Sequence, residues 1–230
     1  MDTALSTRLH DIDARIADAA RAAGRDASEI TRIVVTKFHP ASLVRELHDL
    51  GVRDVGENRQ QEFAAKSTEL AELDDLRWHF IGQAQTNKAR SIRAAAAVVH
   101  TVDRDRLADA LERAGTPEAP PLDVLLQINL TDDAGRGGVA PEGLAPLAEH
   151  VLTSCPSLRL RGLMGVAPLD EEPASAFARL ADHAARLRAI APDARWLSAG
   201  MTGDFTEAIS AGATHLRIGS AITGPRPVRG

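Results

Sequence analysis

A lysine that directly follows an apolar run is the first feature of this sequence that could do chemistry. The run Ile33–Val35 leads through Thr36 to Lys37, and Pro40 prevents a longer strand. Unbroken apolar character predicts a strand that is buried on both faces. An amine at the rim of such a strand loses hydration in its charged form, which lowers its pKa and makes Lys37 a usable nucleophile. The alternative is a lysine that only marks the strand end, with its stem packed and its charge in solvent.

Two segments near the C-terminus combine glycine with hydroxyl residues. They are residues 198–204 and 217–224, and each leads into an expected helix. Turns of this composition point unpaired N–H groups at an anion and let it approach closely. Thr202 is a suitable N-cap for a helix that begins near Asp204. Either segment alone would be read as an ordinary turn and cap. If both follow the last two strands of an α/β barrel, where such folds often bind phosphate, they together predict a phosphate site.

Strand and helix patterns alternate along the whole chain. Apolar residues recur at helical spacing from Leu5 to Ala19, ahead of the first strand. The longest helical pattern covers residues 177–190. The eight expected strands contain residues 33–35, 53–58, 78–82, 98–102, 124–129, 158–164, 196–198 and 215–218.

Eight strands separated by helices predict an α/β protein: one (β/α)8 barrel domain over residues 1–230 with an extra N-terminal helix. A doubly wound open sheet is the runner-up. It is disfavoured because no G-x-G-x-x-G pattern follows the first strand.

Composition narrows the classes of function. A net charge of −5 and a pI near 5.9 argue against a nucleic-acid or anionic-membrane surface. No run is apolar enough for a signal peptide or a membrane span. The single cysteine, Cys155, excludes an internal disulfide, suits a reducing cytoplasm and is expected to be a small buried residue. The eight histidines show no metal-binding spacing, so we expect no metal site. His79 is expected to be a hydrogen-bonded core residue, and Arg226 a solvated one.

A lysine able to form a Schiff base and a phosphate site on the same barrel suggest pyridoxal 5′-phosphate. The sequence is similar to the pyridoxal-phosphate homeostasis protein family, which shares its barrel, of pyridoxal-phosphate fold type III, with the N-terminal domain of alanine racemase. The similarity rests on segments spread in order over nearly the whole chain, namely residues 35–37, 56–59, 78–82, 85–88, 162–164 and 197–224. The resemblance implies a barrel that lacks the second, β domain of the racemase.

The resemblance also implies the residues of a cofactor site. Lys37 would hold the cofactor as a Schiff base. Asn58 would lie beside the cofactor, and Arg217 would face the pyridine nitrogen. The other implied contacts are Met201, Thr202, Gly219 and Ser220 around the phosphate, with Ser198 as a further cofactor contact.

The sequence departs from the family pattern in three places. Gln83 and Ala84 stand where the family usually has histidine and leucine. Asp133 and Arg136 stand where it commonly has glutamate and lysine, and Thr202 replaces serine but keeps the hydroxyl. These differences put loop-borne contacts to a partner or substrate in doubt, and leave the cofactor site intact.

Arg217 bears on the chemistry that such a cofactor could perform. Arginine stays charged and can only donate, so a pyridine nitrogen opposite it stays unprotonated and a delocalised carbanion is disfavoured. A salt bridge inside the barrel mouth is the alternative role for Arg217. The resembled racemase uses a lysine and a tyrosine from its second domain as its two bases. This sequence has no tyrosine, so His39 or another group would have to substitute.

We therefore predict a cytoplasmic pyridoxal 5′-phosphate carrier or regulator that takes part in vitamin B6 homeostasis without turning over amino acids. The expected partners are the cofactor itself and, as recipients, apoenzymes that depend on it, with the chain a monomer or weak homodimer. Two alternatives stay open. One is a racemase-like enzyme that uses the cofactor, and the other is a cofactor-free Schiff-base aldolase that acts on a sugar phosphate.

Overall fold

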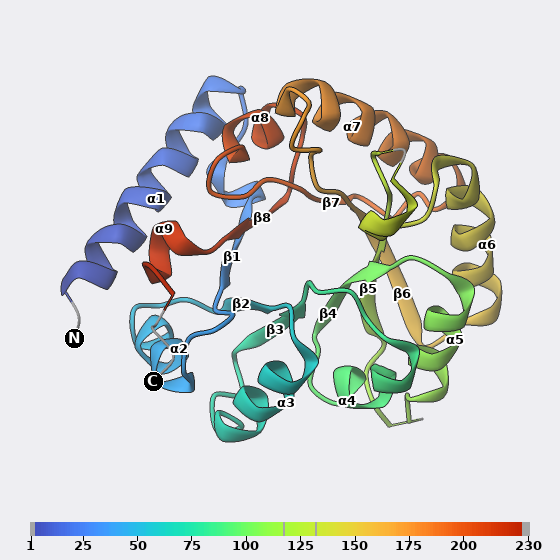
Figure 1. The fold of residues 1–230 in the computed structure, drawn as a ribbon, viewed down its shortest axis with the longest axis horizontal. Helices are drawn as coiled ribbons and strands as arrows, with labels where there is room; N and C mark the ends of the chain where they lie inside the picture. The colour runs from blue at the N-terminus through green and yellow to red at the C-terminus, as the bar shows by residue number, and fades with distance from the viewer. Residues whose placement is uncertain (1–2, 117, 132, 227–230) are drawn as a thin grey trace.

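The computed structural model describes residues 3–116, 118–131 and 133–226, which form a closed barrel of parallel strands (Figure 1). The strands are β1 (Thr31–Val35), β2 (Asp54–Glu57), β3 (Arg77–Phe80), β4 (Val98–Val102), β5 (Leu122–Gln127), β6 (Leu158–Met164), β7 (Trp196–Ser198) and β8 (His215–Ile218). Each strand pairs with the next along the chain. The ring closes because β1 also pairs with β8, with Thr31 opposite His215 and Val34 opposite Ile218. The predicted (β/α)8 barrel is confirmed.

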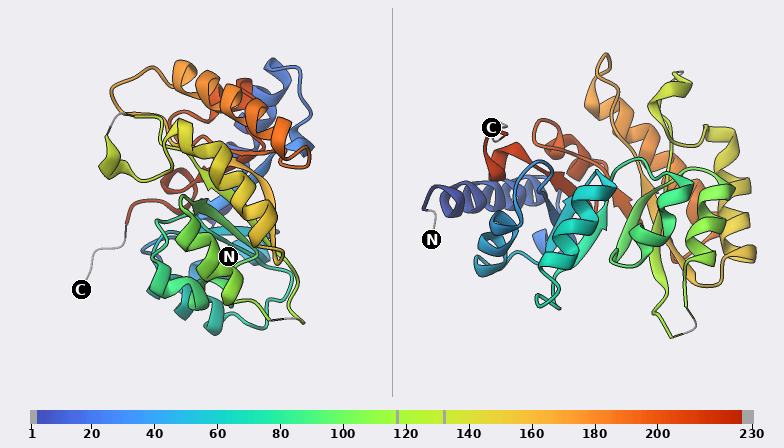
Figure 2. Two further views of the ribbon diagram at one scale, coloured as in Figure 1. Left: turned by 90° about the vertical axis from the view of Figure 1, so that its right-hand side faces the viewer. Right: turned by 60° about the horizontal axis from the view of Figure 1, so that its bottom comes forward.

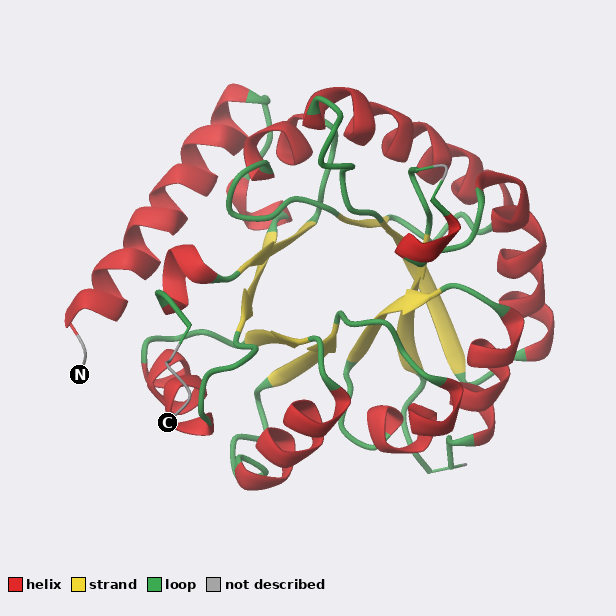
Figure 3. Ribbon diagram, in the orientation of Figure 1, coloured by secondary structure: helices red, strands yellow, loops and turns green. Residues whose placement is uncertain are grey.

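Helices surround this ring on the outside (Figure 3). They are α1 (Thr3–Ala22), α2 (Ala41–Asp49), α3 (Gln60–Glu69), α4 (Ala89–Arg93), α5 (Asp105–Arg113), α6 (Leu144–Ser154), α7 (Pro173–Ile190), α8 (Phe205–Ser210) and α9 (Ser220–Thr223). Short 3-10 turns lie at Ala27–Glu29, Thr86–Lys88, Ala134–Arg136 and Pro141–Gly143. None of the helices in the described ranges is long and apolar enough to cross a membrane.

The extra N-terminal helix is α1. Its apolar stripe, which includes Leu5, Leu9 and Ile12, is buried. The helix packs against α8 and α9 beside the first strand (Figure 2). It ends where Gly24 adopts a φ of +68°, a left-handed conformation that glycine enters without a Cβ penalty. With 20 residues α1 is the longest described helix, so the expectation that residues 177–190 belong to the longest one is wrong.

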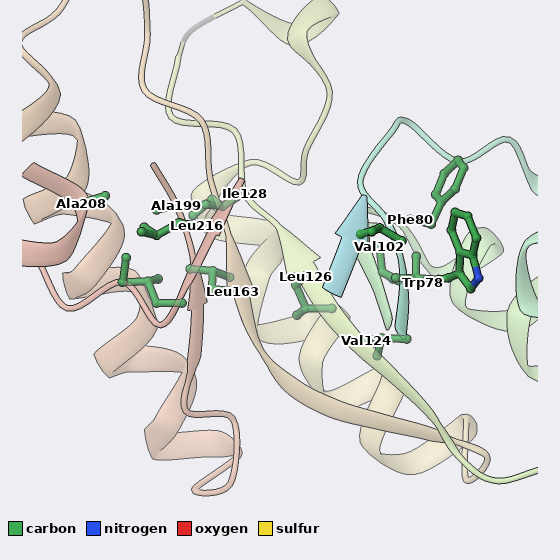
Figure 4. Close-up of a cluster of buried hydrophobic side chains, with 14 of the residues drawn as sticks. Trp78, Phe80, Val102, Val124, Leu126, Ile128, Leu163, Ala199, Ala208 and Leu216 are labelled. Carbon is green, nitrogen blue, oxygen red and sulfur yellow. The ribbon is translucent and has the colours of Figure 1, made fainter. Parts of the chain in front are cut away.

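The main apolar core lies between the strands and the helices, and Figure 4 shows part of it. Phe63 of α3 meets Trp78 and Phe80 of β3 edge-on, with ring centroids 5.9 and 5.5 Å apart respectively. Burying an aromatic side chain of this size contributes roughly 1.5–3 kcal/mol to stability. This packing fixes α3 against β2 and β3. The position of α3 matters because the helix also contacts the end of β1.

Candidate functional site

Lys37 lies just beyond the C-terminal end of β1 and is half-buried. The strand before it is buried on both faces, as predicted, with Val34 fully buried and Val35 6% exposed. Phe38 then adopts a φ of +69°, the left-handed region, which costs a residue with a side chain about 1–2 kcal/mol. The chain therefore turns sharply after Lys37 and enters α2 at Ala41.

A pocket of about 450 Å³ opens beside Lys37. Its walls come from the C-terminal ends of strands, and from the loops that follow them, in sequentially distant parts of the chain. Of the residues predicted for the cofactor site, those that line this pocket are Lys37, Asn58, Met201, Thr202, Arg217, Gly219 and Ser220. The lysine and the two glycine-bearing segments thus share one rim of the barrel, as the sequence predicted.

The segment after β7 differs from the prediction in the residue that caps α8. The N-cap of α8 is Asp204, and the carboxylate of this residue accepts a hydrogen bond from the Met201 backbone N–H at 2.6 Å. The prediction that Thr202 caps this helix is wrong, because the carboxylate folds back over the turn and the helix starts at Phe205. Thr202 faces the pocket instead. Met201 is 39% exposed at the rim, so it is not a core packing residue.

Arg217 is buried beneath the pocket and held by two hydrogen bonds. Its guanidinium donates to Ser198 Oγ at 2.7 Å and to the Gly165 carbonyl at 3.0 Å. Among the described residues no carboxylate comes within ion-pair distance of it, so the salt-bridge alternative is wrong. Burial lowers the pKa of Arg217 to about 10, and the group therefore stays charged at neutral pH. Ser198 is fully buried and is not one of the residues that line the pocket. It contacts Arg217 through the hydrogen bond at its Oγ.

A chain of buried hydrogen bonds continues from Ser198 into the barrel interior. Ser198 Oγ lies 2.9 Å from His100 Nδ1, and His100 Nε2 lies 2.9 Å from His79 Nδ1. His79 Nε2 ends the chain 2.8 Å from Asp54 Oδ1. The prediction that His79 is a hydrogen-bonded core residue is confirmed. No sequence pattern could connect these residues, because they lie on four different strands.

The residues at the two ends of this hydrogen-bonded series determine which ring nitrogen of each histidine carries a proton. Arg217 can only donate, and the ionised carboxylate of Asp54 can only accept. The arrangement that satisfies every pair has Ser198 donating to His100, His100 donating to His79, and His79 donating to Asp54. Both histidines are then neutral. Burial lowers the pKa of His79 and lowers that of His100 well below its usual range, which agrees with this assignment.

Asn58 lines the Lys37 pocket and carries an unpaired polar atom. Its Oδ1 is buried and has no hydrogen-bond partner among the described residues. Buried polar atoms are usually paired, so this one marks a position where a ligand could make a contact. Gly82, at the end of β3, fixes the loop because a Cβ there would lie 1.9 Å from the Asn58 carbonyl oxygen. Only glycine allows this close approach.

Several pocket-lining side chains were not selected as site residues from the sequence, and Phe38 and Arg226 are two of them. Phe38 lines the pocket, and the Cζ atom of Arg226 lies 4.2 Å from the centre of its ring. Arg226 is exposed, as expected for a solvated residue, yet it also lines the pocket. The sequence signal that could have found it is its position, a few residues beyond the second glycine-bearing segment.

The departures at Gln83, Ala84, Asp133 and Arg136 lie outside the Lys37 pocket, whereas Thr202, which keeps the hydroxyl, lines it. Asp133 and Arg136 line a different hollow of about 820 Å³, formed with the loop that follows β6. Gln83 lines a third pocket of about 380 Å³, which touches the first at Asn58. These placements agree with the expectation that the departures affect loop-borne contacts and leave the residues around Lys37 in place.

One group of side chains resembles a metal-binding set. Ligand atoms of Asp109, His150 and Cys155 lie within 4.8 Å of one another. His150 Nε2 is already hydrogen-bonded to Asp109 Oδ1 at 2.8 Å. Burial raises the pKa of the Cys155 thiol to about 11, which disfavours the thiolate that binds metals. Cys155 is 1% exposed and is the small buried residue that the sequence predicted.

Comparison with known proteins defines the class of this barrel. Residues 8–227 match the family described as alanine racemase, N-terminal domain. The alanine racemase of Corynebacterium glutamicum shares the fold with a TM-score of 0.67 at 16% identity, over 96% of this chain and 62% of that one.

Closer relatives narrow the assignment. The pyridoxal phosphate homeostasis protein of Pseudomonas aeruginosa is 44% identical over 228 residues, 96% of each chain. PipY of Synechococcus elongatus, solved with pyridoxal phosphate bound, superposes with a TM-score of 0.83 at 33% identity, over 96% of this chain and 100% of PipY. The chain belongs to the pyridoxal phosphate homeostasis protein family.

Proposed function

We propose that this chain binds pyridoxal 5′-phosphate through Lys37 and takes part in intracellular vitamin B6 homeostasis as a carrier or regulator. The observation that carries the proposal is the meeting of Lys37, Arg217 and both glycine-bearing segments in one pocket. The curated relatives are named for pyridoxal phosphate homeostasis, and PipY was solved with the cofactor bound.

The lining of the pocket fits this cofactor in charge and size. It contains the cations Lys37, Arg217 and Arg226, and no carboxylate among its described residues. A volume of about 450 Å³ lies within the usual range for small-molecule sites. Such a pocket favours an anionic ligand, which the phosphate ester of the cofactor supplies. Asn58, another lining residue, has an unpaired Oδ1 that a bound ligand could satisfy.

Each residue has a distinct task in this proposal. The cofactor supplies an aldehyde, which condenses reversibly with a primary amine and releases water. Lys37 provides that amine. Arg217 presents a fixed, charged donor to the pyridine ring, because Ser198 and the Gly165 carbonyl hold its guanidinium. Hydroxyl and backbone groups of the two segments would hold the phosphate, and the lining residues that supply them are Met201, Thr202, Gly219 and Ser220.

Absorbance spectroscopy tests the proposal directly. Purified protein that has been incubated with pyridoxal 5′-phosphate and desalted should be yellow. Borohydride should bleach it and leave a stable adduct on the peptide that contains Lys37, as measured by mass spectrometry. The variant Lys37→Ala should retain no cofactor, because no other described lining residue of the pocket carries a primary amine. A colourless wild type, as a cofactor-free aldolase would be, would contradict the proposal.

Amino-acid turnover is a second candidate, favoured by the position of His39. This imidazole lines the same pocket as Lys37. Burial lowers the pKa of His39, and the positive charge of Lys66 lowers it further. A neutral imidazole could act as the second base that a racemase needs. Incubation of the loaded protein with alanine or serine distinguishes the two functions. The carrier should leave the amino acid unchanged, whereas a racemase would convert it and lose that activity in His39→Ala.

We also propose that the chain works in the cytoplasm as a monomer or weak homodimer and passes the cofactor to apoenzymes that depend on it. Large apolar side chains are exposed at few described positions, namely Leu152, Leu169 and Met201. So small an exposed apolar surface does not favour a tight permanent dimer. Sedimentation at increasing protein concentration tests the oligomeric state. Faster activation of an apoenzyme by the loaded chain than by the free cofactor would support transfer.

A further inference from the structure

Helix α3 holds the backbone on both sides of Lys37. Lys66 donates from Nζ to the Thr36 carbonyl at 2.9 Å, and Glu62 accepts from the Phe38 N–H at 2.8 Å through Oε2. The two α3 residues are four positions apart, so they lie on the same face of the helix. The peptide groups that precede and follow Lys37 are therefore both bonded to charged side chains of one helix.

Lys66 belongs to a buried ion pair. Its Nζ lies 2.6 Å from Glu57 Oε1, and the Thr36 hydroxyl donates to the same oxygen at 2.6 Å. Glu57 is fully buried and Lys66 is 6% exposed. Glu57 precedes the pocket residue Asn58 on the neighbouring strand. The pair thus joins the two strand ends that carry Lys37 and Asn58.

A buried ion pair of this kind contributes little net stability, because desolvation offsets much of the attraction between the charges. Burial raises the pKa of Glu57, although Lys66 lowers it, which shows that the group is poorly solvated. The side-chain hydrogen bonds that the pair makes to other residues both end at Thr36, the residue directly before Lys37.

The backbone that this network holds is strained. Phe38 adopts its left-handed φ of +69° with a side chain present, and such conformations persist when the surroundings fix them. Glu62 bonds the Phe38 N–H, and the Phe38 ring lies 5.2 Å from the Arg59 guanidinium. Loss of the Glu62 contact would let Phe38 relax toward an extended conformation. The Cα of Lys37 would move with it.

We propose that Lys66, Glu57 and Glu62 are positioning residues that orient the Lys37 amine toward the pocket. None of the three lines that pocket, so they act through the backbone of Thr36 and Phe38. The inference rests on the proposed binding of pyridoxal 5′-phosphate at Lys37. It assigns a second lysine to the site, with a structural task and no covalent one.

The first test compares two substitutions on α3. Glu62→Ala removes the acceptor for the Phe38 N–H, and Glu69→Ala makes the same change at an exposed position of the same helix. Glu62→Ala should speed amide hydrogen exchange in the peptide that contains Phe38 and weaken pyridoxal 5′-phosphate binding about tenfold, since small displacements of a reacting group have large effects. Glu69→Ala should match the wild type in both the exchange rate and the affinity for the cofactor. Equal affinity in the two variants would overturn the role of Glu62.

The second test concerns the ion pair. Lys66→Met alone leaves Glu57 buried without its partner and could unfold the protein, so it is made together with Glu57→Gln, which removes both charges. The double variant should keep a cooperative melt yet bind the cofactor about tenfold more weakly. Borohydride should still place the adduct on Lys37. A stable double variant with wild-type affinity would overturn the proposal for the pair.

If the double variant also fails to fold, Lys66→Arg decides the question. This change keeps the charge and alters the geometry of the donor. Weaker cofactor binding with faster exchange at the Thr36–Phe38 backbone supports the proposal, and unchanged values of both overturn it. These outcomes are separate from failure of the proposed function, in which the wild type itself would form no adduct at Lys37.

Discussion

Two lysines lie close to the end of β1, and their surroundings give them different roles. Lys66 is held by the Glu57 carboxylate and the Thr36 carbonyl. Lys37 has no hydrogen-bond or ion-pair partner among the described residues, and its Nζ lies 6.0 Å from the centre of the Phe38 ring. A carboxylate partner stabilises the charged ammonium and so opposes nucleophilic attack. Lys37 is therefore the amine available for reaction, and Lys66 is not.

The hydrogen bonds of Arg217 lead to a prediction for single substitutions of this residue. In Arg217→Met the Gly165 carbonyl and the Ser198 hydroxyl lose their donor in a buried site. An unsatisfied buried polar group costs about 1–3 kcal/mol, so the free energy of unfolding in urea should fall by about that amount. Arg217→Lys keeps a charged donor but loses the planar fork that reaches both acceptors, so its stability should lie between that of Arg217→Met and that of the wild type. Unchanged stability in Arg217→Met would contradict the geometry described for this residue.

At the scale of elements, α1 shows how a segment far from the site in sequence supports it. The helix covers α8, which follows the first glycine-bearing segment, and α9, which lies within the second. Arg8 of α1 donates to the Ile222 carbonyl of α9 at 2.7 Å. The apolar face of α1 is buried, whereas its other face is exposed. Most of its contribution to stability must therefore come from packing and not from helix propensity.

Truncation of a buried side chain in α1 tests this view. Leu9 is 4% exposed, and Leu9→Ala should lower the free energy of unfolding by about 2–5 kcal/mol, because it removes apolar contacts and leaves a cavity. Asp11→Asn changes an exposed residue of the same helix and should shift stability by less than about 0.5 kcal/mol. Urea denaturation of the three proteins at one pH gives both values. Similar losses in the two variants would contradict the packing of α1.

For the whole molecule, the buried histidines make stability depend on pH. Burial lowers the pKa of His215 to about 3, and it also lowers the pKa values of His79 and His100. The unfolded chain takes up protons on these residues below about pH 6.5, whereas the folded chain does not. Stability is therefore full above about pH 6.5 and falls as the pH drops toward about 3.

The contribution of His215 to this pH dependence can be measured separately. Between pH 7 and pH 5 the wild type should lose about 2 kcal/mol of unfolding free energy through His215. His215→Gln has no titrating group there and should show a correspondingly smaller loss over the same interval, whatever its stability at pH 7. Urea denaturation curves at the two pH values measure the difference. An identical loss in both proteins would show that His215 is not the source.

Local patterns in the sequence were enough to predict the barrel and to select Lys37 as the candidate reactive residue. Apolar runs predicted where the strands lie, and glycine with proline predicted where several elements end, because these signals act over a few residues. Lys37 and the two glycine-bearing segments could be placed at one rim, since all strands of a parallel barrel end on the same side. The predicted N-cap of α8 was wrong because Thr202 and Asp204 are both residue types that often cap helices. Only the folded turn selects Asp204.

Tertiary structure alone decided the contacts between side chains that are distant in the sequence. The hydrogen-bonded chain from Asp54 to Arg217 needs strands β2, β3, β4, β7 and β8 to enclose one interior. The bonds from Lys66 and Glu62 to the neighbours of Lys37 need α3 to pack against β1. A sequence shows which residues could donate or accept, whereas the partner of each is fixed by closure of the barrel, which brings together residues that no short-range pattern connects.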